Sequence, residues 1–178
     1  MLRQVELLEK VKSYDPNVEE KLLNKAYVFS MRAHGSQTRA SGDPFFSHPL
    51  EVAGILADHK FDSRTIITAL LHDVVEDNND HTLERIQKEF GDKIAKIVDG
   101  LTKIGKLNTK GYSDVSIQAE NYRKMLLTLN EDVRVIIIKI ADRLHNMQTL
   151  GSMPYEKQIQ KASETLYIYA PLAHRIGL

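Results

Sequence analysis

Cysteine is absent from this sequence, and its absence removes several kinds of chemistry together. A chain without thiols forms no disulfide, binds no metal through thiolate and uses no cysteine nucleophile. This composition fits a reducing compartment, so we expect a cytoplasmic protein. Long apolar runs are missing as well: none approaches the ~20 residues of a membrane-spanning helix. The charged, amphipathic N-terminus is unlike a signal peptide, and we expect no membrane partner.

An excess of charge of one sign is also missing. The 24 acidic residues balance the 24 basic residues in a chain of 178. Domains that bind nucleic acid usually carry a basic excess, so the balance argues against a nucleic-acid partner. The length and the hydrophobic content of 42% are ordinary for a globular protein with one substantial core. We therefore predict a single domain over residues 1–178.

Apolar residues recur at helical spacing through most of the chain, which predicts an all-α fold. The first long helix is expected between Asn17 as N-cap and Gly35 as C-terminal stop. Pro49 suits the first turn of the next helix and places His48 at its N-cap. Further helices are expected over residues 63–73, 82–91, 117–130 and 154–178, the last of them broken near residue 171.

Two segments need a separate interpretation. The run 133–140 is rich in β-branched residues and by pattern alone is compatible with a buried strand. No second run of this kind exists to pair with it, so a central helix that is buried on most sides is favoured. The segment 105–116 contains Lys and Gly without periodicity, and we predict a mobile loop there.

The stretch LLHDVVEDNND, residues 70–80, places a His and an Asp together and adds three more acidic residues. On a helix, Asp73, Glu76 and Asp77 would share one face, where like charges repel unless water or a cation takes up the charge. Apolar neighbours place His72 and Asp73 at the edge of the core. Asp80 is interpreted as part of a solvated acidic loop. The pair His72–Asp73 is therefore a candidate metal site.

A metal needs further ligands from elsewhere in the chain. His48 is one candidate, and Asp142 is the other because it directly follows the buried run, where an unpaired carboxylate is costly. The alternative for Asp142 is an ion pair with Arg143 or with an Arg of another helix. Two His and two carboxylates suit Mn²⁺, with Mg²⁺, Fe²⁺ or Zn²⁺ as alternatives. Four protein ligands would leave places for water and a phosphate oxygen, which suits metal-assisted hydrolysis.

The ordered set H…HD…D resembles that of the HD superfamily of metal-dependent phosphohydrolases. Over roughly residues 20–178 the sequence is similar to the hydrolase domain of the long RelA/SpoT proteins, in the segments RASGDPFFSHP, ALLHDVVED, FGDKIAKIVDGLTKIGKL, QAENYRKML, DVRVIIIKIADRLHNM and ETLYIYAPLAHRIGL. The resemblance implies an all-α HD fold. It also implies Mn²⁺-dependent breakdown of the alarmone (p)ppGpp, with pyrophosphate released from the ribose 3′ position to leave GDP or GTP.

The resemblance also implies roles for single residues. The implied Mn²⁺ ligands are His48, His72, Asp73 and Asp142. Glu76 and Asp77 match the acidic pair that activates or orients the attacking water. The implied substrate-binding residues are Arg39, which packs against the guanine, Ser41 beside it, and Asn146 and Thr149, which line the nucleotide pocket.

Two positions depart from the family pattern: Ala40 stands where Lys or Ser is frequent, and Gln148 stands where Arg is usual. Neither is a metal ligand in that pattern. The HD motif is intact, as in the SpoT-like members whose hydrolase is active. The long members continue into a synthetase domain, but no synthetase motif is present here, so we expect no synthesis of (p)ppGpp.

Two other functions remain as alternatives. The first is an HD phosphohydrolase that acts on another phosphorylated nucleotide. The second is a catalytically silent module that binds nucleotide and signals to a further domain. The RASGDP loop with Arg39, which generic HD enzymes lack, favours the guanosine alarmone as the substrate.

Overall fold

The computed structural model describes residues 2–77, 82–105, 123 and 132–178. Within these ranges the regular elements are helices, and one isolated bridge joins Thr38 and Pro44, so the predicted all-α class is confirmed. The elements are α1 (Gln4–Lys12), α2 (Glu20–His34), α3 (Ser47–Asp58), α4 (Ser63–Leu71), α5 (Val74–Asp77), α6 (Leu83–Phe90), α7 (Asp92–Gly105), α9 (Val133–Gln148), η1 (Leu150–Ser152), α10 (Tyr155–Glu164), η2 (Thr165–Tyr169) and α11 (Ala170–Arg175). In the part of the chain so described, no helix is long and apolar enough to cross a membrane.

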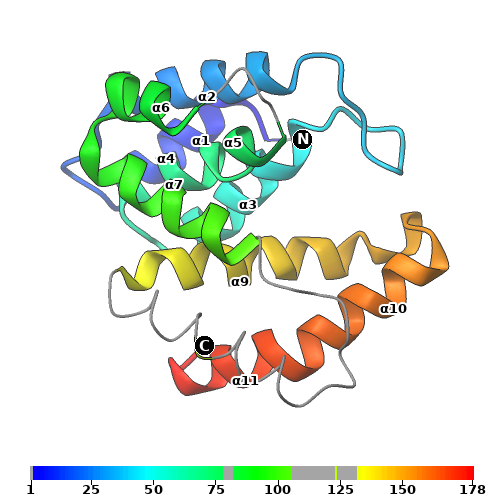
Figure 1. Ribbon diagram of the computed structural model, residues 1–178. Coiled ribbons are helices and arrows are strands. Elements are labelled where there is room, and N and C mark those ends of the chain that lie inside the picture. The colour runs from blue at the N-terminus through cyan, green and yellow to red at the C-terminus, as the bar shows by residue number, and fades with distance from the viewer. Residues whose placement is uncertain (1, 78–81, 106–122, 124–131) are drawn as a thin grey trace.

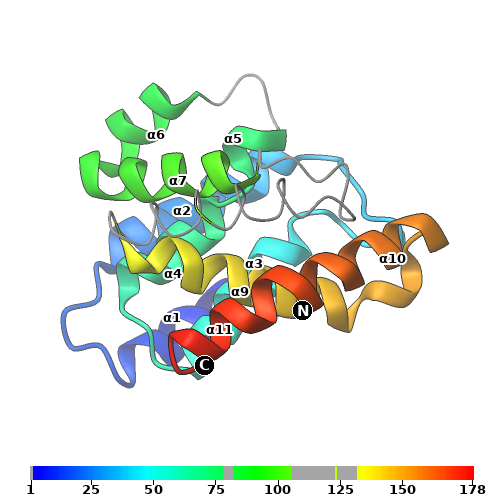
Figure 2. The same ribbon diagram turned by 60° about the horizontal axis from the view of Figure 1, so that its bottom comes forward.

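Helix α9 lies between two groups of helices (Figure 1). On one side it packs against α3, α4 and α7, and on the other against α10 and η2. Figure 2 shows the run from α10 to α11 crossing in front of α9. The predicted central helix over the β-branched run is therefore confirmed, and Val135, Ile136 and Ile138 are buried in the core. A strand is excluded here because the backbone makes its hydrogen bonds within the helix itself.

The helix ends follow local chemistry in most places. The Thr82 hydroxyl accepts the backbone N–H of Arg85 and caps α6, and Gly91 ends it at φ 86°. Gly35 likewise ends α2 at φ 47°, in the left-handed region that favours glycine. The predicted start of α2 was wrong: the N-cap is Glu19, while the N–H of Asn17 donates to Asp15 Oδ1 in a preceding turn.

The start of α3 also differs from the prediction. Its N-cap is Phe46, so His48 lies inside the first turn of the helix and not at the cap. At the other end of the chain, the predicted break near Pro171 is confirmed. The α-helical ladder of α10 widens into the π-helix η2 immediately before α11, whose second residue is Pro171. Proline has no N–H to donate, so it cannot continue the regular ladder.

Two predictions fall largely outside the described residues. The loop predicted at 105–116 has only Gly105 within them, as the last residue of α7. The helix predicted at 117–130 also lies outside them, except for residue 123.

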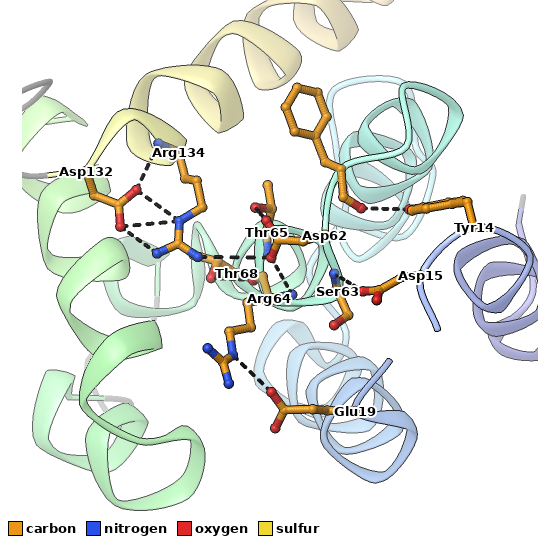
Figure 3. A network of polar contacts seen from close by, with 11 residues as sticks. Tyr14, Asp15, Glu19, Asp62, Ser63, Arg64, Thr65, Thr68, Asp132 and Arg134 are labelled. Atoms are coloured by element: carbon orange, nitrogen blue, oxygen red, sulfur yellow. Dashed lines mark hydrogen bonds and ion pairs between the residues drawn. The ribbon is translucent and has the colours of Figure 1, made fainter. Parts of the chain in front are cut away.

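A polar network joins the beginnings of α4 and α9 (Figure 3). Asp62 caps α4, since one of its oxygens accepts the N–H groups of Arg64 and Thr65 and the other accepts the Thr65 hydroxyl. Asp132 caps α9 and pairs with Arg134 at 2.7 Å. The Arg134 guanidinium also lies 4.0 Å from Asp62, which links the two caps. The network therefore links the beginning of α9, which carries Asp142, to that of α4, whose end leads to His72 and Asp73.

Replacing Asp62 tests the contribution of this cap to stability. We expect Asp62→Ala to lower the free energy of unfolding by about 1 kcal/mol, because two helix N–H groups lose their acceptor. Asp62→Asn keeps an amide oxygen at the same place and should stay close to the wild type. Urea unfolding followed by circular dichroism measures both, and equal midpoints for the Ala and Asn variants would contradict a capping role.

Candidate metal centre and substrate cavity

The four predicted metal ligands come from three distant parts of the chain and meet at one place. His48 is on α3, His72 and Asp73 follow α4, and Asp142 is on α9. His48 Nε2 lies 3.1 Å from Asp142 Oδ1 and 3.5 Å from Asp73 Oδ2. His72 Nε2 lies 3.0 Å from the same oxygen of Asp73. Among the described residues, ligand atoms of His48, His72 and Asp73 lie within 4.8 Å of one another, close enough to share one ion.

The backbone of α4 fixes the orientation of His72. Its Nδ1 lies 2.7 Å from the carbonyl oxygen of Ala69, so Nδ1 carries the hydrogen and donates. In the neutral ring this leaves the lone pair on Nε2, which is buried without a hydrogen bond of good geometry and lies against Asp73. A lone pair and a carboxylate repel each other unless a proton or a cation lies between them. Coordination of a metal through His72 Nε2 requires this ring orientation, in which Nδ1 donates to the backbone.

His48 is held by a residue to which the sequence analysis assigned no role. Its Nδ1 lies 2.8 Å from Nδ1 of His145, so one nitrogen donates and the other accepts. Burial, together with the neighbouring His48 and the positive charge of Arg39, lowers the pKa of His145 to about 4. His145 is therefore neutral and can accept from His48, which turns His48 Nε2 toward the carboxylates. The available signal was its spacing of three residues from Asp142.

The charged groups of the centre shift one another's pKa values. Burial opposes the charge of Asp142, but the hydrogen bond from His48 and the charge of Lys139 hold its pKa well below the usual range. Burial likewise opposes a proton on His72, but Asp73 and Asp142 outweigh it and raise the pKa of His72 to about 9. The buried carboxylates thus keep their charge by drawing positive charge toward them. A divalent cation meets the same need, and two imidazoles with two carboxylates form a suitable donor set.

The alternative pairing considered for Asp142 was wrong. Arg143 donates through Nη2 to Glu164 at 2.6 Å, and Asp142 instead accepts from Asn146 at 2.6 Å and lies against His48. The helical placement of the His72–Asp73 pair also needs correction, because both residues lie in the turn between α4 and α5. That turn allows both side chains to point to the same centre.

Glu76 lies on α5 beside the metal ligands, and its carboxylate is closely surrounded. Lys139 Nζ, on buried α9, lies 3.7 Å from Glu76 Oε1. A β-carbon at position 105 would lie 2.5 Å from both carboxylate oxygens, so a side chain there would require the Glu76 carboxylate to move. Asp77 ends α5, and its side chain is outside the described part.

A cavity of about 510 Å³ opens beside the centre, within the usual size range of ligand sites. Arg39 and Ala40 line it from the loop before α3, and residues of α9, α10 and η2 line it from the other direction. Arg39 Nη2 donates to Asn146 Oδ1 at 3.3 Å, and Asn146 in turn donates to Asp142. One predicted substrate-binding residue, Asn146, therefore contacts the predicted metal ligand Asp142, and a second, Arg39, is linked to it through Asn146.

The other residues of the predicted pocket take positions around the cavity without lining it. The hydroxyl of exposed Ser41 donates to Asp43 Oδ2 at 2.8 Å and shapes the loop that carries Arg39. Thr149 is the C-cap of α9, and its hydroxyl donates to the carbonyl oxygen of His145 at 3.0 Å. Gln148 is exposed. The structure brings Arg39 and Asn146 to the cavity and leaves Ser41 and Thr149 beside it.

A family model described as an HD domain matches residues 26–178. The chain belongs to the HD domain family. This confirms the fold expected from the order of the His and Asp residues, and it agrees with their convergence in three dimensions.

Relatives of this HD domain confirm its resemblance to RelA/SpoT proteins. It is 57% identical over all 178 residues to the GTP pyrophosphokinase rsh of Brucella ovis, of which it spans 23%. It is 46% identical over 168 residues to the bifunctional (p)ppGpp synthase/hydrolase SpoT of Escherichia coli K12, covering 94% of this chain and 24% of that protein. The chain thus spans about a quarter of the length of these relatives.

A solved structure supports the fold independently. A metazoan ortholog of SpoT, described as hydrolysing ppGpp, aligns with a TM-score of 0.63 and 23% identity. The alignment covers 86% of this chain and 94% of the other. At this identity the likeness concerns the fold alone.

Replacement of the ligands tests the metal centre directly. We expect His72→Ala and Asp73→Ala to remove bound Mn²⁺, because each takes away a donor atom that no neighbour replaces. His174→Ala, at an exposed position on α11, is the matched control and should keep the metal. Elemental analysis after dialysis against Mn²⁺ measures the content, and undiminished metal in both ligand variants would exclude this site.

Proposed function

We propose that this HD domain hydrolyses (p)ppGpp at the ribose 3′ position with Mn²⁺ as its cofactor, releasing pyrophosphate and leaving GDP or GTP. The observation that carries the proposal is the hydrogen-bonded path from Arg39 through Asn146 to Asp142. The path supports the proposal because it joins a candidate base-binding side chain to a candidate metal ligand, and both line one cavity. The relatives support it, since one from E. coli O157:H7 is named guanosine-3′,5′-bis(diphosphate) 3′-pyrophosphohydrolase.

The metal centre and the acidic residues beside it divide the chemistry. His48, His72, Asp73 and Asp142 would hold the ion, which would supply Lewis-acid chemistry to a phosphoryl oxygen and to the attacking water. Glu76 accepts the proton of the attacking water, and Asp77 orients that water. The ammonium of Lys139, 3.7 Å from Glu76 Oε1, orients the Glu76 carboxylate, which lies close to the backbone at Gly105.

The nucleotide contacts come from the opposite part of the cavity. The planar guanidinium of Arg39 can stack on the guanine ring while it stays hydrogen-bonded to Asn146. Ser41 contributes by shaping the loop through Asp43, and Thr149 contributes by ending α9 next to Asn146. Substrate choice therefore rests on the loop before α3, since a metal centre alone can cleave many phosphate esters.

The direct test is an assay on purified protein. Incubation with ppGpp and Mn²⁺ should yield GDP and pyrophosphate, and a chelator should abolish turnover. Mn²⁺ should restore it better than Mg²⁺. Hydrolysis of other nucleotides at equal rates would favour the broader HD phosphohydrolase. Binding of ppGpp without hydrolysis would favour the silent regulatory module.

The role of Glu76 predicts a separation between metal binding and turnover. We expect Glu76→Gln to lower kcat by about 10²–10⁴, the usual loss when a general base is removed. Metal content should stay near the wild-type level, because Glu76 is not among the proposed ligands. Parallel kinetics and elemental analysis measure the two quantities, and joint loss of metal and activity would make Glu76 a ligand instead.

The role of Arg39 predicts a change in nucleotide affinity alone. Arg39→Ala should weaken ppGpp binding by about 1–2 kcal/mol, the loss of one stacking contact. Calorimetry with metal-loaded protein measures the ppGpp affinity. Arg32→Ala, at an exposed position of α2, is the control. Equal affinities for wild type and Arg39→Ala would remove Arg39 from the base pocket.

A further inference from the structure

A second cationic region lines the cavity away from the loop that carries Arg39. Lys139 and Arg143, one helical turn apart on α9, and Lys161 on α10 all line the cavity, and we name these three residues the cationic wall. Lys139 and Arg143 are buried and Lys161 is half-buried. The proposed mechanism uses Lys139 to hold Glu76 and gives no role to Arg143 or Lys161.

Arg143 is committed to structure. It donates to Glu164 Oε2 at 2.6 Å, and its guanidinium carbon lies 4.4 Å from the centre of the Tyr169 ring. Its Nε and Nη1 are buried and have no hydrogen-bond partner among the described residues. These contacts fasten α9 to α10 and η2, so Arg143 sets the position of the wall.

Lys161 differs from Arg143 because the carboxylate on its own helix that could pair with it, that of Glu164, already accepts other hydrogen bonds. Glu164 lies three residues further along α10, on the same face of that helix. One of its carboxylate oxygens accepts from Arg143 and the other accepts from Gln160 Nε2 at 3.0 Å. Within the described part of the chain, the Lys161 ammonium forms no ion pair or hydrogen bond of its own. Burial and the charge of Arg143 lower the pKa of Lys161, although Glu164 and Asp142 partly offset this.

The charge balance of the cavity points the same way. The four cationic side chains that line it, Arg39 and the cationic wall, match four carboxylates: Asp73, Glu76, Asp142 and Glu164. A bound divalent ion would therefore leave an excess of two positive charges. An anionic ligand bound in the cavity would neutralise this excess.

We propose that Lys161 binds the 5′ diphosphate of the nucleotide while the metal centre holds the 3′ diphosphate. The inference rests on the proposed function, since (p)ppGpp carries diphosphates at both ribose positions. Lys139 lies beside Glu76, Asp73 and Asp142, where the reacting group would be. Lys161 lies on α10, within electrostatic range of Glu164 and Asp142, and forms no ion pair with either carboxylate in the described part of the chain. It is therefore placed for the second phosphate group of the same ligand.

Two substrates that differ only at the 5′ position test the inference. Lys161→Met removes the charge and keeps the length of the stem. We expect it to lower kcat/KM for guanosine 3′,5′-bis(diphosphate) by roughly 10- to 100-fold, the loss of one charged hydrogen bond. The value for guanosine 3′-diphosphate, which has a free 5′ hydroxyl, should change less than about 3-fold. Lys161→Arg should keep most of the activity on both substrates.

Lys157→Met is the matched control, since Lys157 is exposed on the same helix and does not line the cavity. It should behave as the wild type on both substrates. An equal loss on both substrates in Lys161→Met, with weaker inhibition by inorganic pyrophosphate, would assign Lys161 to the leaving group and overturn the 5′ assignment. Unchanged kinetics on both substrates would overturn it as well.

Binding provides a readout that does not depend on turnover. Calorimetry on metal-loaded Glu76→Gln protein, with and without Lys161→Met, compares the affinities for the same two nucleotides. A loss confined to the bis(diphosphate) supports the subsite, and equal losses or none overturn it. If wild-type protein hydrolyses neither nucleotide, the proposed function fails, and the calorimetric comparison still decides the role of Lys161.

Discussion

The burial of two carboxylates against two imidazoles is the constraint on which the rest of the structure depends. Asp73 and Asp142 lie in a place where an uncompensated negative charge is costly, and His48 and His72 turn their Nε2 atoms toward them. A hydrogen bond at Nδ1 fixes each ring. For His72 the partner is the carbonyl oxygen of Ala69, and for His48 it is His145. The centre therefore has a strong demand for a cation and little freedom to rearrange. A divalent ion satisfies this demand with the geometry already in place.

Helix α9 connects this centre with everything around it. Its apolar residues pack into the core, and Lys139, Asp142, Arg143 and Asn146 point to the cavity because positions three, four and seven apart share one helix face. Through these four residues one helix touches Glu76, the metal ligands, Arg39 and Glu164. A rigid helix thus holds the metal centre and the proposed nucleotide contacts at fixed separations. The capped beginning of α9 is tied to that of α4, whose end leads to the other ligands.

Sequence reasoning succeeded where one physical signal dominated and failed where two competed. The β-branched run was correctly interpreted as a helix because a lone strand has no partner for its backbone. The start of α2 was wrong because Asn17 is a good capping residue, yet its N–H is used in a turn with Asp15. The His72–Asp73 pair was placed on a helix because its apolar flanks continue the helical pattern. The chain bends there to aim both side chains at one centre.

The sequence by itself determined the all-α class, several helix ends and the four candidate metal ligands. Helix caps and apolar periodicity act over a few residues, so they can be read along the chain. Only the tertiary structure decided that Arg143 pairs with Glu164 and not with Asp142, that His145 holds His48, and that the Glu76 carboxylate lies against Gly105. These contacts join residues far apart in sequence, and they depend on how α9 packs between the two groups of helices.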